Sequence, residues 1–148
     1  AIMDYLRDKY GLIIGERTAE NIKIRIACAI RPKRSKSMEV GGRDSIYGLP
    51  KVVDVDSVEI FEAIREPLGS IINMIRETLK ITPPELVVDI MDRGIVLSGG
   101  SVQLNTFNKL ITKESGVAGH VALEPQFCVI KGTGMAMENF DVYRKALR

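Results

Sequence analysis

The sequence has 148 residues, of which 45% are hydrophobic, and this is enough to form one ordinary domain with a real core. Its 21 basic and 19 acidic residues leave a net charge of only +2, and only 5% of the residues are aromatic, so we expect no nucleic-acid partner. One histidine and two cysteines are too few to assemble a metal-ligand cluster, and charges interrupt every apolar run, which argues against a membrane span.

The first ten residues already have the pattern of a helix interior. Apolar residues such as Ile2 and Leu6 recur at helical spacing, no capping residue precedes them, and Gly11 ends the pattern. We therefore expect the sequence to be a piece of a longer protein.

Residues 16–29 form a second helical pattern, with an apolar residue at every third or fourth position. Glu20 and Lys23 lie three residues apart, so they are neighbours on a more polar face of this helix. Two interpretations of the pair stay open. An exposed ion pair would stabilise the helix by only roughly a few tenths of a kcal/mol. In a binding site, both side chains would hydrogen-bond the hydroxyl groups of a ligand.

Two short strands are expected at residues 38–40 and 52–55, with turns rich in glycine and proline between them. Two strands alone are marginally stable, so this hairpin must pack on neighbouring helices or pair with a further strand. The basic loop at residues 32–37 is interpreted as a solvated turn, because its three cations are too few to hold a polyanion. Residues 11–57 are expected to form a small α/β lobe.

The longest predicted helix starts at residue 57. Asp56 and Glu59 resemble a capping box, and apolar residues then keep helical spacing for more than twenty positions, as in a helix that packs on the core. Pro67 removes one backbone hydrogen bond inside this helix, which predicts a kink or a break into two helices. A further helix is expected at residues 84–93.

A buried strand is predicted at residues 94–97, and it leads into Gly99 and Gly100 and then into another helix. Because glycine has no Cβ, the backbone there could approach a ligand closely, and free N–H groups at the start of the helix would favour an anion. A tight turn between strand and helix explains the glycine pair equally well.

The remaining sequence predicts a helix over residues 104–115, a buried strand over 120–123 and a long last helix over 125–137. From residue 58 onward, helices and strands alternate. This alternation predicts an α/β fold with parallel strands covered by helices. Only two strands are visible in this part, so we expect the sheet to be incomplete.

A few single residues have a simple structural interpretation. Gly132 and Gly134, inside the last helix, are expected to mark close backbone packing. His120 is expected to be structural because it is the only histidine. Cys28 and Cys128 fall in helical patterns and are expected to be reduced, buried thiols of a cytoplasmic protein.

Three passages carry patterns that are specific in order and spacing. They are YGLIIGERTAENIK at residues 10–23, REPL at 65–68, and TPPEL with RGIVLSGG at 82–86 and 93–100. Together they resemble the bacterial actin homologues of the MreB family, and the match extends over essentially the whole chain.

The resemblance implies a partial actin-like lobe with the ribonuclease H-like fold, similar to the C-terminal part of the second lobe of that family. Residues 11–57 would form the small outer subdomain with its β-hairpin. The larger inner subdomain would comprise residues 1–10 and 58–148.

The resemblance also implies a function. Proteins of this family bind ATP or ADP with Mg²⁺ between two lobes and assemble into filaments that direct cell shape and wall synthesis. The implied location is cytoplasmic, at the inner face of the cell membrane, with the membrane-associated cell-shape machinery as partner. The family's phosphate-binding hairpins and magnesium ligands have no match in this sequence, so no catalytic or metal-binding residue is assigned and this piece alone should not hydrolyse ATP.

The resemblance places the adenosine contacts in two passages. The helical ion pair would meet the ribose, the turn after the strand would pack against the base and the ribose-phosphate, and one glutamine would lie near the adenine edge. The matching positions are Glu20, Lys23, Gly99, Gly100, Ser101 and Gln103.

Two alternative functions stay open on the sequence alone. The chain could be a lobe of a non-polymerising ATPase of the Hsp70-like or sugar-kinase-like type. It could also be a nucleotide-free interaction module, in which Gly99 and Gly100 only make a turn.

Overall fold

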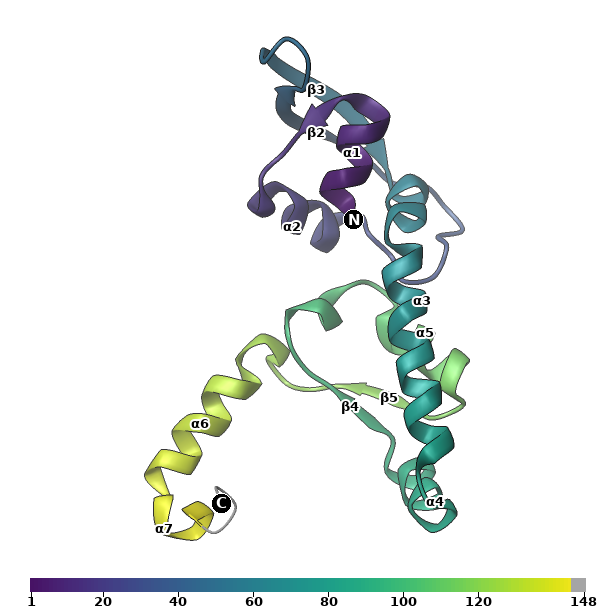
Figure 1. Ribbon diagram of the computed structural model, residues 1–148, viewed down its shortest axis with the longest axis vertical. Helices are drawn as coiled ribbons and strands as arrows, with labels where there is room; N and C mark the ends of the chain where they lie inside the picture. Colours follow the sequence, from purple (N-terminus) through teal and green to yellow (C-terminus); the bar gives the residue numbers. More distant parts are fainter. Residues whose placement is uncertain (145–148) are drawn as a thin grey trace.

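The elements fall into two groups, which one long helix joins (Figure 1). The computed structural model describes residues 1–144. The first group, at the top of Figure 1, contains α1 (Ile2–Tyr10), β1 (Leu12–Ile13), α2 (Glu16–Arg25), β2 (Ser37–Asp44) and β3 (Pro50–Asp56). The long helix α3 (Ser57–Ile81) leads down to α4 (Pro84–Arg93), β4 (Ile95–Leu97), the 3₁₀ turn η1 (Gly100–Gln103), α5 (Phe107–Ser115), β5 (Gly119–Val121), the 3₁₀ turn η2 (Pro125–Phe127), α6 (Cys128–Glu138) and α7 (Phe140–Tyr143).

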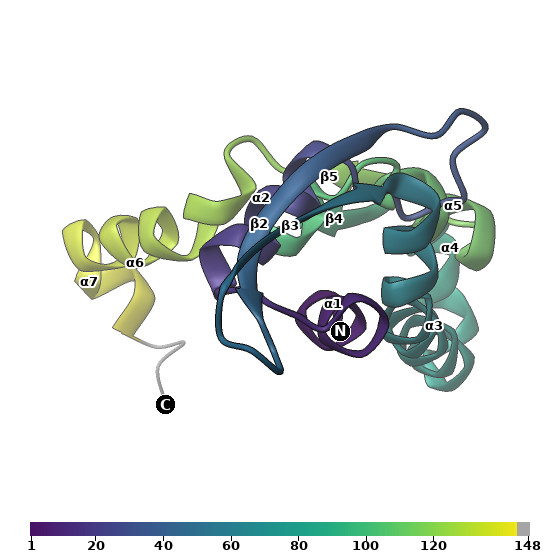
Figure 2. The same cartoon turned by 90° about the horizontal axis from the view of Figure 1, so that it is seen from above.

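The first group is built on an antiparallel sheet with the strand order β1-β2-β3. The predicted hairpin is confirmed, and it is longer than expected, since β2 and β3 pair from Ser37↔Asp56 to Arg43↔Pro50. The further strand that the hairpin requires is β1, which pairs Leu12 with Asp44. Viewed from above, α1 lies beside the start of α3 (Figure 2).

The turn of the hairpin is held by a carboxylate. Asp44 accepts hydrogen bonds of 2.9 Å from the backbone N–H groups of Ile46 and Tyr47, and its other oxygen lies 2.9 Å from Lys51 Nζ. Lys51 also donates to the carbonyl of Tyr10 at the end of α1 (2.7 Å). The Tyr47 N–H, Lys51 and the Ile46 N–H together lower the pKa of Asp44 to about 2, because each favours the charged carboxylate.

Helix α3 begins as predicted and continues through its proline. Asp56 accepts hydrogen bonds from the N–H groups of Val58 (2.7 Å) and Glu59 (3.0 Å), which confirms the capping box. The predicted break at Pro67 is wrong, since α3 runs from Ser57 to Ile81 as one helix. Ile64 and Leu68, on either side of the proline, are both buried. Their packing holds the two halves of the helix in place although one backbone bond is lost.

The predicted helix over residues 16–29 is too long. Helix α2 ends at Arg25, because the next residues leave it to contact the segment before α5. The N–H of Ala29 donates to the carbonyl of Asn105 (2.8 Å), and the Asn105 side chain donates to the carbonyl of Ala27 (3.1 Å). Cys28 therefore lies in a single parallel bridge with Asn105, not in a helix, and it is only partly buried.

The second sheet consists of β4 and β5, which pair in parallel from Ile95↔Gly119 to Leu97↔Val121. This confirms the parallel arrangement, although β5 starts one residue earlier than predicted and ends two residues earlier. The expectation that both strands are buried is wrong. Leu97 is 8% exposed where it meets Gly119 near α5, but Val96 points to the other face and is 70% exposed. Among residues 1–144, helices cover only one face of this sheet.

The last helix differs from its prediction in two ways. It starts with η2, and α6 proper begins at Cys128, which is partly buried. None of the residues Cys128–Glu138 is buried, and a Cβ at Gly132 or Gly134 would have no neighbour within 4 Å. The expected close packing at these glycines is therefore wrong. In both views α6 and α7 extend away from the other elements (Figures 1 and 2).

One core connects the two groups and fixes the position of α3. It consists of buried apolar residues from the first group, from one stripe of α3 and from the segment that ends in α5, among them Leu6, Leu12, Ile22, Val40, Val55, Ile60, Ile64, Leu68, Leu97, Val102, Phe107 and Ile111. None of the helices within residues 1–144 is long and apolar enough to cross a membrane.

Candidate functional site

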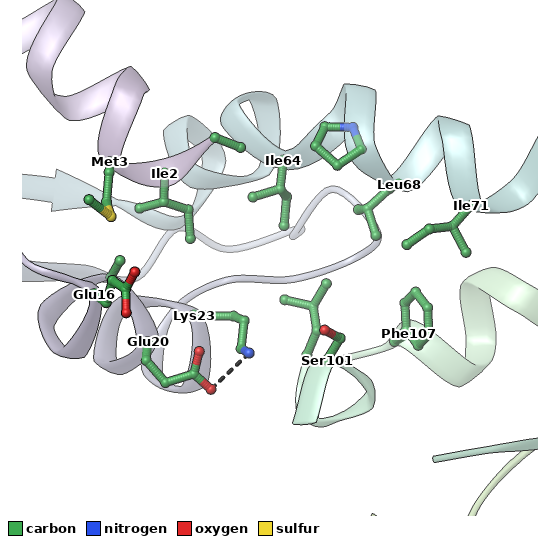
Figure 3. Close-up of a pocket in the computed structure, with 14 residues that line it drawn as sticks. Ile2, Met3, Glu16, Glu20, Lys23, Ile64, Leu68, Ile71, Ser101 and Phe107 are labelled. Carbon is green, nitrogen blue, oxygen red and sulfur yellow. Dashed lines mark ion pairs between the residues drawn. The ribbon is translucent and has the colours of Figure 1, made fainter. Parts of the chain in front are cut away.

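A cavity of about 340 Å³ opens where the two groups meet (Figure 3). The start of α1, one side of α2, the middle of α3 and the segment from η1 to α5 surround it. Its lining is mostly apolar and comprises Ile2, Met3, Ala19, Ile64, Pro67, Leu68, Ile71, Leu104 and Phe107. The polar side chains that line it are few, namely Glu16, Glu20, Lys23 and Ser101.

The predicted ion pair forms one edge of this cavity. Glu20 Oε1 lies 2.8 Å from Lys23 Nζ, and Figure 3 shows both side chains on α2 across from Ser101. The Glu20 side chain is 49% exposed and that of Lys23 is 21% exposed. The carboxylate can accept a hydrogen bond from a hydroxyl group while the ammonium donates one, so the pair suits a ligand with neighbouring hydroxyls.

The glycine pair makes a turn whose geometry requires glycine at one position. Gly99 has φ 90° and ψ 168°, a region of backbone space that other residues almost never adopt. Its N–H donates to the carbonyl of Pro125 (2.7 Å), so it is not free to bind an anion. The predicted α-helix directly after the pair is wrong as well, because only the short turn η1 follows and α5 starts at Phe107.

The six predicted site residues divide into two sets. Glu20, Lys23 and Ser101 line the cavity, and Gly99, Gly100 and Gln103 do not. The second set forms a neighbouring surface on η1. There, a Cβ at Gly99 or Gly100 would meet no atom within 4 Å, and Gln103 Nε2 donates to Oε1 of Gln126 on η2 (2.8 Å).

Sequence reasoning missed most of the cavity. One stripe of α3 lines the cavity and consists of Ile64, Pro67, Leu68 and Ile71. Its spacing is that of any helix that packs on a core, so the pattern predicts core residues and not a cavity. Glu16 opens α2 and carries no signal beyond an acidic first turn. Only Pro67 is unusual for a helix interior, and it could have drawn attention to this stripe.

The carboxylates near the cavity do not form a metal site. Within residues 1–144, the structure contains no group of three or more His, Cys, Asp or Glu side chains that could hold a metal ion. Glu16 and Glu20 are the carboxylates that line the cavity, and Glu20 is already paired with Lys23. These residues do not fit the oxygen cage that Mg²⁺ prefers.

The chain is similar in sequence to bacterial cell shape-determining proteins. The family model described as MreB/Mbl protein matches residues 1–145. Mbl of Bacillus subtilis (strain 168) is 41% identical over 140 residues, which cover 95% of this chain and 42% of that protein. MreB of Escherichia coli (strain K12) is 41% identical over 143 residues, covering 97% and 41%.

Solved structures agree with this similarity. MreB5 of Spiroplasma citri bound to ADP superposes with a TM-score of 0.84 at 32% identity, covering 94% of this chain and 42% of that one. The same protein bound to AMPPNP gives a TM-score of 0.84 at 31% identity, covering 99% and 44%. The chain thus spans about two fifths of the length of these relatives. On both sequence and its actin-like fold, the chain belongs to the MreB/Mbl family.

Proposed function

We propose that this chain supplies the adenosine side of the nucleotide cleft in an ATP-binding, filament-forming, actin-like protein that directs cell shape and wall synthesis. The observation that carries the proposal is the cavity whose edge is the Glu20–Lys23 ion pair, with Ser101 across from it. Two further observations support it: the similar proteins Mbl and MreB are cell shape-determining proteins, and MreB5 of Spiroplasma citri binds ADP and AMPPNP.

In this proposal the ribose lies at the mouth of the cavity. Glu20 accepts a hydrogen bond from one ribose hydroxyl, and Lys23 donates one to the oxygen of its neighbour. Ser101, on η1, faces the same space, and the base extends over the open backbone of Gly99 and Gly100. The apolar lining beneath strengthens the charged hydrogen bonds, because it lowers the local dielectric constant.

The proposal also assigns the two subdomains of the lobe. Residues 11–57 form the small outer subdomain, and residues 1–10 and 58–148 the inner one, of which 145–148 lie outside the described residues. The two sheets, which share no strand among the described residues, support this division. Helix α1 bridges the two parts, since it contacts β1 and α2 as well as α3.

Phosphate and magnesium would be bound by other parts of the protein. The nucleotide is expected to carry Mg²⁺, but the carboxylates of this chain do not fit the ion, so its ligands and the groups that stabilise phosphoryl transfer belong to the facing side of the cleft. The role of this chain is then to hold and orient the adenosine.

Self-association is supported by exposed apolar side chains on two elements, the β2–β3 turn and α4. These elements lie at opposite ends of the long axis (Figure 1). At one end, Ile46, Tyr47 and Leu49 project from the turn between β2 and β3. At the other end, Leu86 and Met91 on α4 face solvent. Exposed apolar clusters of this kind mark protein-interaction sites. We further propose that the filaments lie in the cytoplasm at the inner face of the cell membrane, and that their partner is the membrane-associated cell-shape machinery.

The variants Glu20→Ala and Lys23→Ala test the site in the intact protein. Each removes charge-assisted hydrogen bonds of roughly 1.5–3 kcal/mol, so ATP binding should weaken by about tenfold to a hundredfold in calorimetric titrations. Glu77→Ala and Lys80→Ala are the matched controls, because that exposed pair has the same spacing on α3 but lies away from the cavity. Unchanged affinity in both test variants would refute the ribose assignment.

The polymer part of the proposal has a separate test. The intact protein should sediment as filaments in the presence of ATP and magnesium. If it binds ATP but stays monomeric at high concentration, a non-polymerising ATPase would be the better description. If it binds no nucleotide at all, the interaction-module alternative would gain support.

A further inference from the structure

A groove lies between α3 and α5, on the face of α3 next to the one that lines the adenosine cavity. Two hollows of about 270 Å³ and 530 Å³ form it, and they are continuous because they share part of their lining, including Phe61 and Leu110. Along α3 the groove reaches from Phe61 to Arg76, which is roughly 20 Å at a rise of about 1.5 Å per residue. It is therefore long enough for about four turns of a second helix.

The groove has apolar residues at its centre and charged residues along its rim. Ala29, Leu68 and Ile72 are buried, and Phe61 and Leu110 beside them are partly exposed. The charged lining residues are Arg31, Glu62, Arg65, Arg76, Lys113 and Glu114. Interfaces between proteins have the same arrangement, an apolar centre surrounded by a polar rim.

The cations on the rim outnumber the carboxylates that neutralise them. Glu114 is bound by Arg76, whose Nη2 lies 2.7 Å from Glu114 Oε2. The two carboxylate oxygens of Glu62 each lie 3.6 Å from a guanidinium nitrogen, one of Arg31 and one of Arg65. With four cations and two carboxylates, the rim has a surplus of two positive charges.

The basic loop beside the groove adds to this surplus. Residues 31–36 have the sequence RPKRSK, with four cations and no carboxylate, and the loop lies beside the upper part of α3 (Figure 1). Both of its ends are fixed, because the Ile30 N–H donates to Thr106 Oγ1 (3.2 Å) and the Lys36 N–H donates to Ser57 Oγ (3.0 Å). The cations of the loop alone are too few to hold a polyanion, but the rim extends them with cations of α3 and α5.

We propose that this groove binds an acidic amphipathic helix of a partner protein. One apolar face of that helix would pack on Phe61 and Leu110, and acidic side chains at its flanks would pair with Arg65, Lys113 and the loop cations. A free anion or a flat anionic membrane would leave the apolar centre of the groove in water, so the lining favours a protein partner. The proposal does not depend on the adenosine site, which lies on another face of α3.

Three synthetic peptides of about 15 residues test the proposal on the intact protein by fluorescence anisotropy. The first has leucines on one helical face and glutamates at the flanks. The second has lysines in place of the glutamates, and the third has glutamines in place of the leucines. The first should bind about tenfold more tightly than the other two, because only it complements both the charge and the apolar centre. If it did not bind, or if either of the others bound as tightly, the proposal would be overturned.

Charge reversal locates the binding surface. Arg65→Glu and Lys113→Glu, on α3 and α5, should each weaken binding of the acidic peptide by about tenfold, because an attraction becomes a repulsion. Lys80→Glu is the matched control, since the side chains of Arg65 and Lys80 are both 74% exposed and each lies three residues after a glutamate of α3. Thermal unfolding identifies the variants that fold. Equal affinities in Lys80→Glu and the folded test variants would overturn the proposal.

Vesicles of phosphatidylglycerol distinguish a protein partner from an anionic membrane. Cosedimentation with these vesicles should be the same for Arg65→Glu and Lys80→Glu, because the groove is not expected to contact lipid. If the vesicles lost Arg65→Glu and Lys113→Glu but kept Lys80→Glu, the cations of the groove would serve a lipid surface and the partner helix would be wrong.

Discussion

The two sheets of this chain are packed very differently. In the antiparallel sheet, Leu12, Val40 and Val55 are at most 1% exposed, and α1 and α3 pack against this sheet at β1 and β3. In the parallel sheet, Leu97 is buried but its neighbour Val96 is 70% exposed. The first region buries its apolar side chains against other elements of the same chain. The second region has one covered face and one open face.

The candidate site lies at the boundary between these regions. Glu20 and Lys23 come from the well-packed region, and Ser101 and Gln103 come from the open one. The backbone contacts of Ala27 and Ala29 with Asn105 hold the two halves together. The geometry of the site therefore depends on contacts between the regions and not on either region alone.

The largest expected effect comes from truncating a buried residue of α3, which packs on the antiparallel sheet, compared with an exposed residue of the parallel sheet. Ile60→Ala removes a fully buried side chain and should lower the free energy of unfolding by about 2–5 kcal/mol. Val96→Ala changes an exposed side chain and should stay within about 0.5 kcal/mol of the unmodified chain. Urea denaturation of the two variants measures the difference. Equal effects would contradict the contrast between the two regions.

The glycine turn should respond next most strongly. Gly99→Ala forces alanine into a conformation with φ 90° and ψ 168°, which should cost about 1–3 kcal/mol of stability. Gly100→Ala is the control, because its φ is not positive and its Cβ would point into open space. Thermal unfolding should separate the two variants. If both alanines were equally tolerated, backbone strain would not be the reason for glycine at position 99.

A smaller effect is expected at the boundary itself. Asn105→Ala removes the side-chain bond to the carbonyl of Ala27 and should cost about 0.5–1.5 kcal/mol. Because Asn105 joins the two halves of the site, the same variant should also weaken ATP binding. Asn108→Ala, in the neighbouring helix α5, is the control, because its side chain makes no hydrogen bond among the described residues. If Asn105→Ala lowered the stability but left the affinity for ATP unchanged, the Asn105 contact would not be what positions the two halves of the site.

The smallest effect is the pH dependence of the hairpin turn. The pKa of Asp44 falls from 3.8 to about 2 in the folded chain, so its ionised form is stabilised by folding. This contribution is complete above pH 3.8 and is lost as the pH falls toward 2. Asp44→Asn lacks the charge at every pH, so the stability difference from the unmodified chain should shrink over this interval. A difference that stayed constant down to pH 2 would contradict the pKa shift.

Sequence patterns predicted most elements of the fold and three of the four polar side chains that line the cavity, Glu20, Lys23 and Ser101. The helix ends at Gly11, Gly94 and Gly116 and the capping box at Asp56 follow from residues that are close in sequence. The Glu20–Lys23 pair follows from helical spacing alone. These features were predictable because their energies depend on neighbours within one or two helical turns.

Other features could not be predicted because distant residues decide them. The two-residue strand β1 is too short to show a pattern, and it exists only because β2 pairs with it. Helix α2 stops at Arg25 because Asn105 binds the residues beyond it. The stripe of α3 around Pro67 lines a cavity where periodicity alone suggests core.

The sequence by itself determined the family, the types of the elements and the side-chain pair at the edge of the cavity. All three depend on short, ordered patterns of residues that are close in the chain. Only the tertiary structure decided that Ser101 faces the cavity, that the Gly99 N–H is occupied by Pro125, and that Gln103 meets Gln126. Those contacts join η1 to segments more than twenty residues away in the chain, and a hydrogen bond over that separation depends on how the whole core packs.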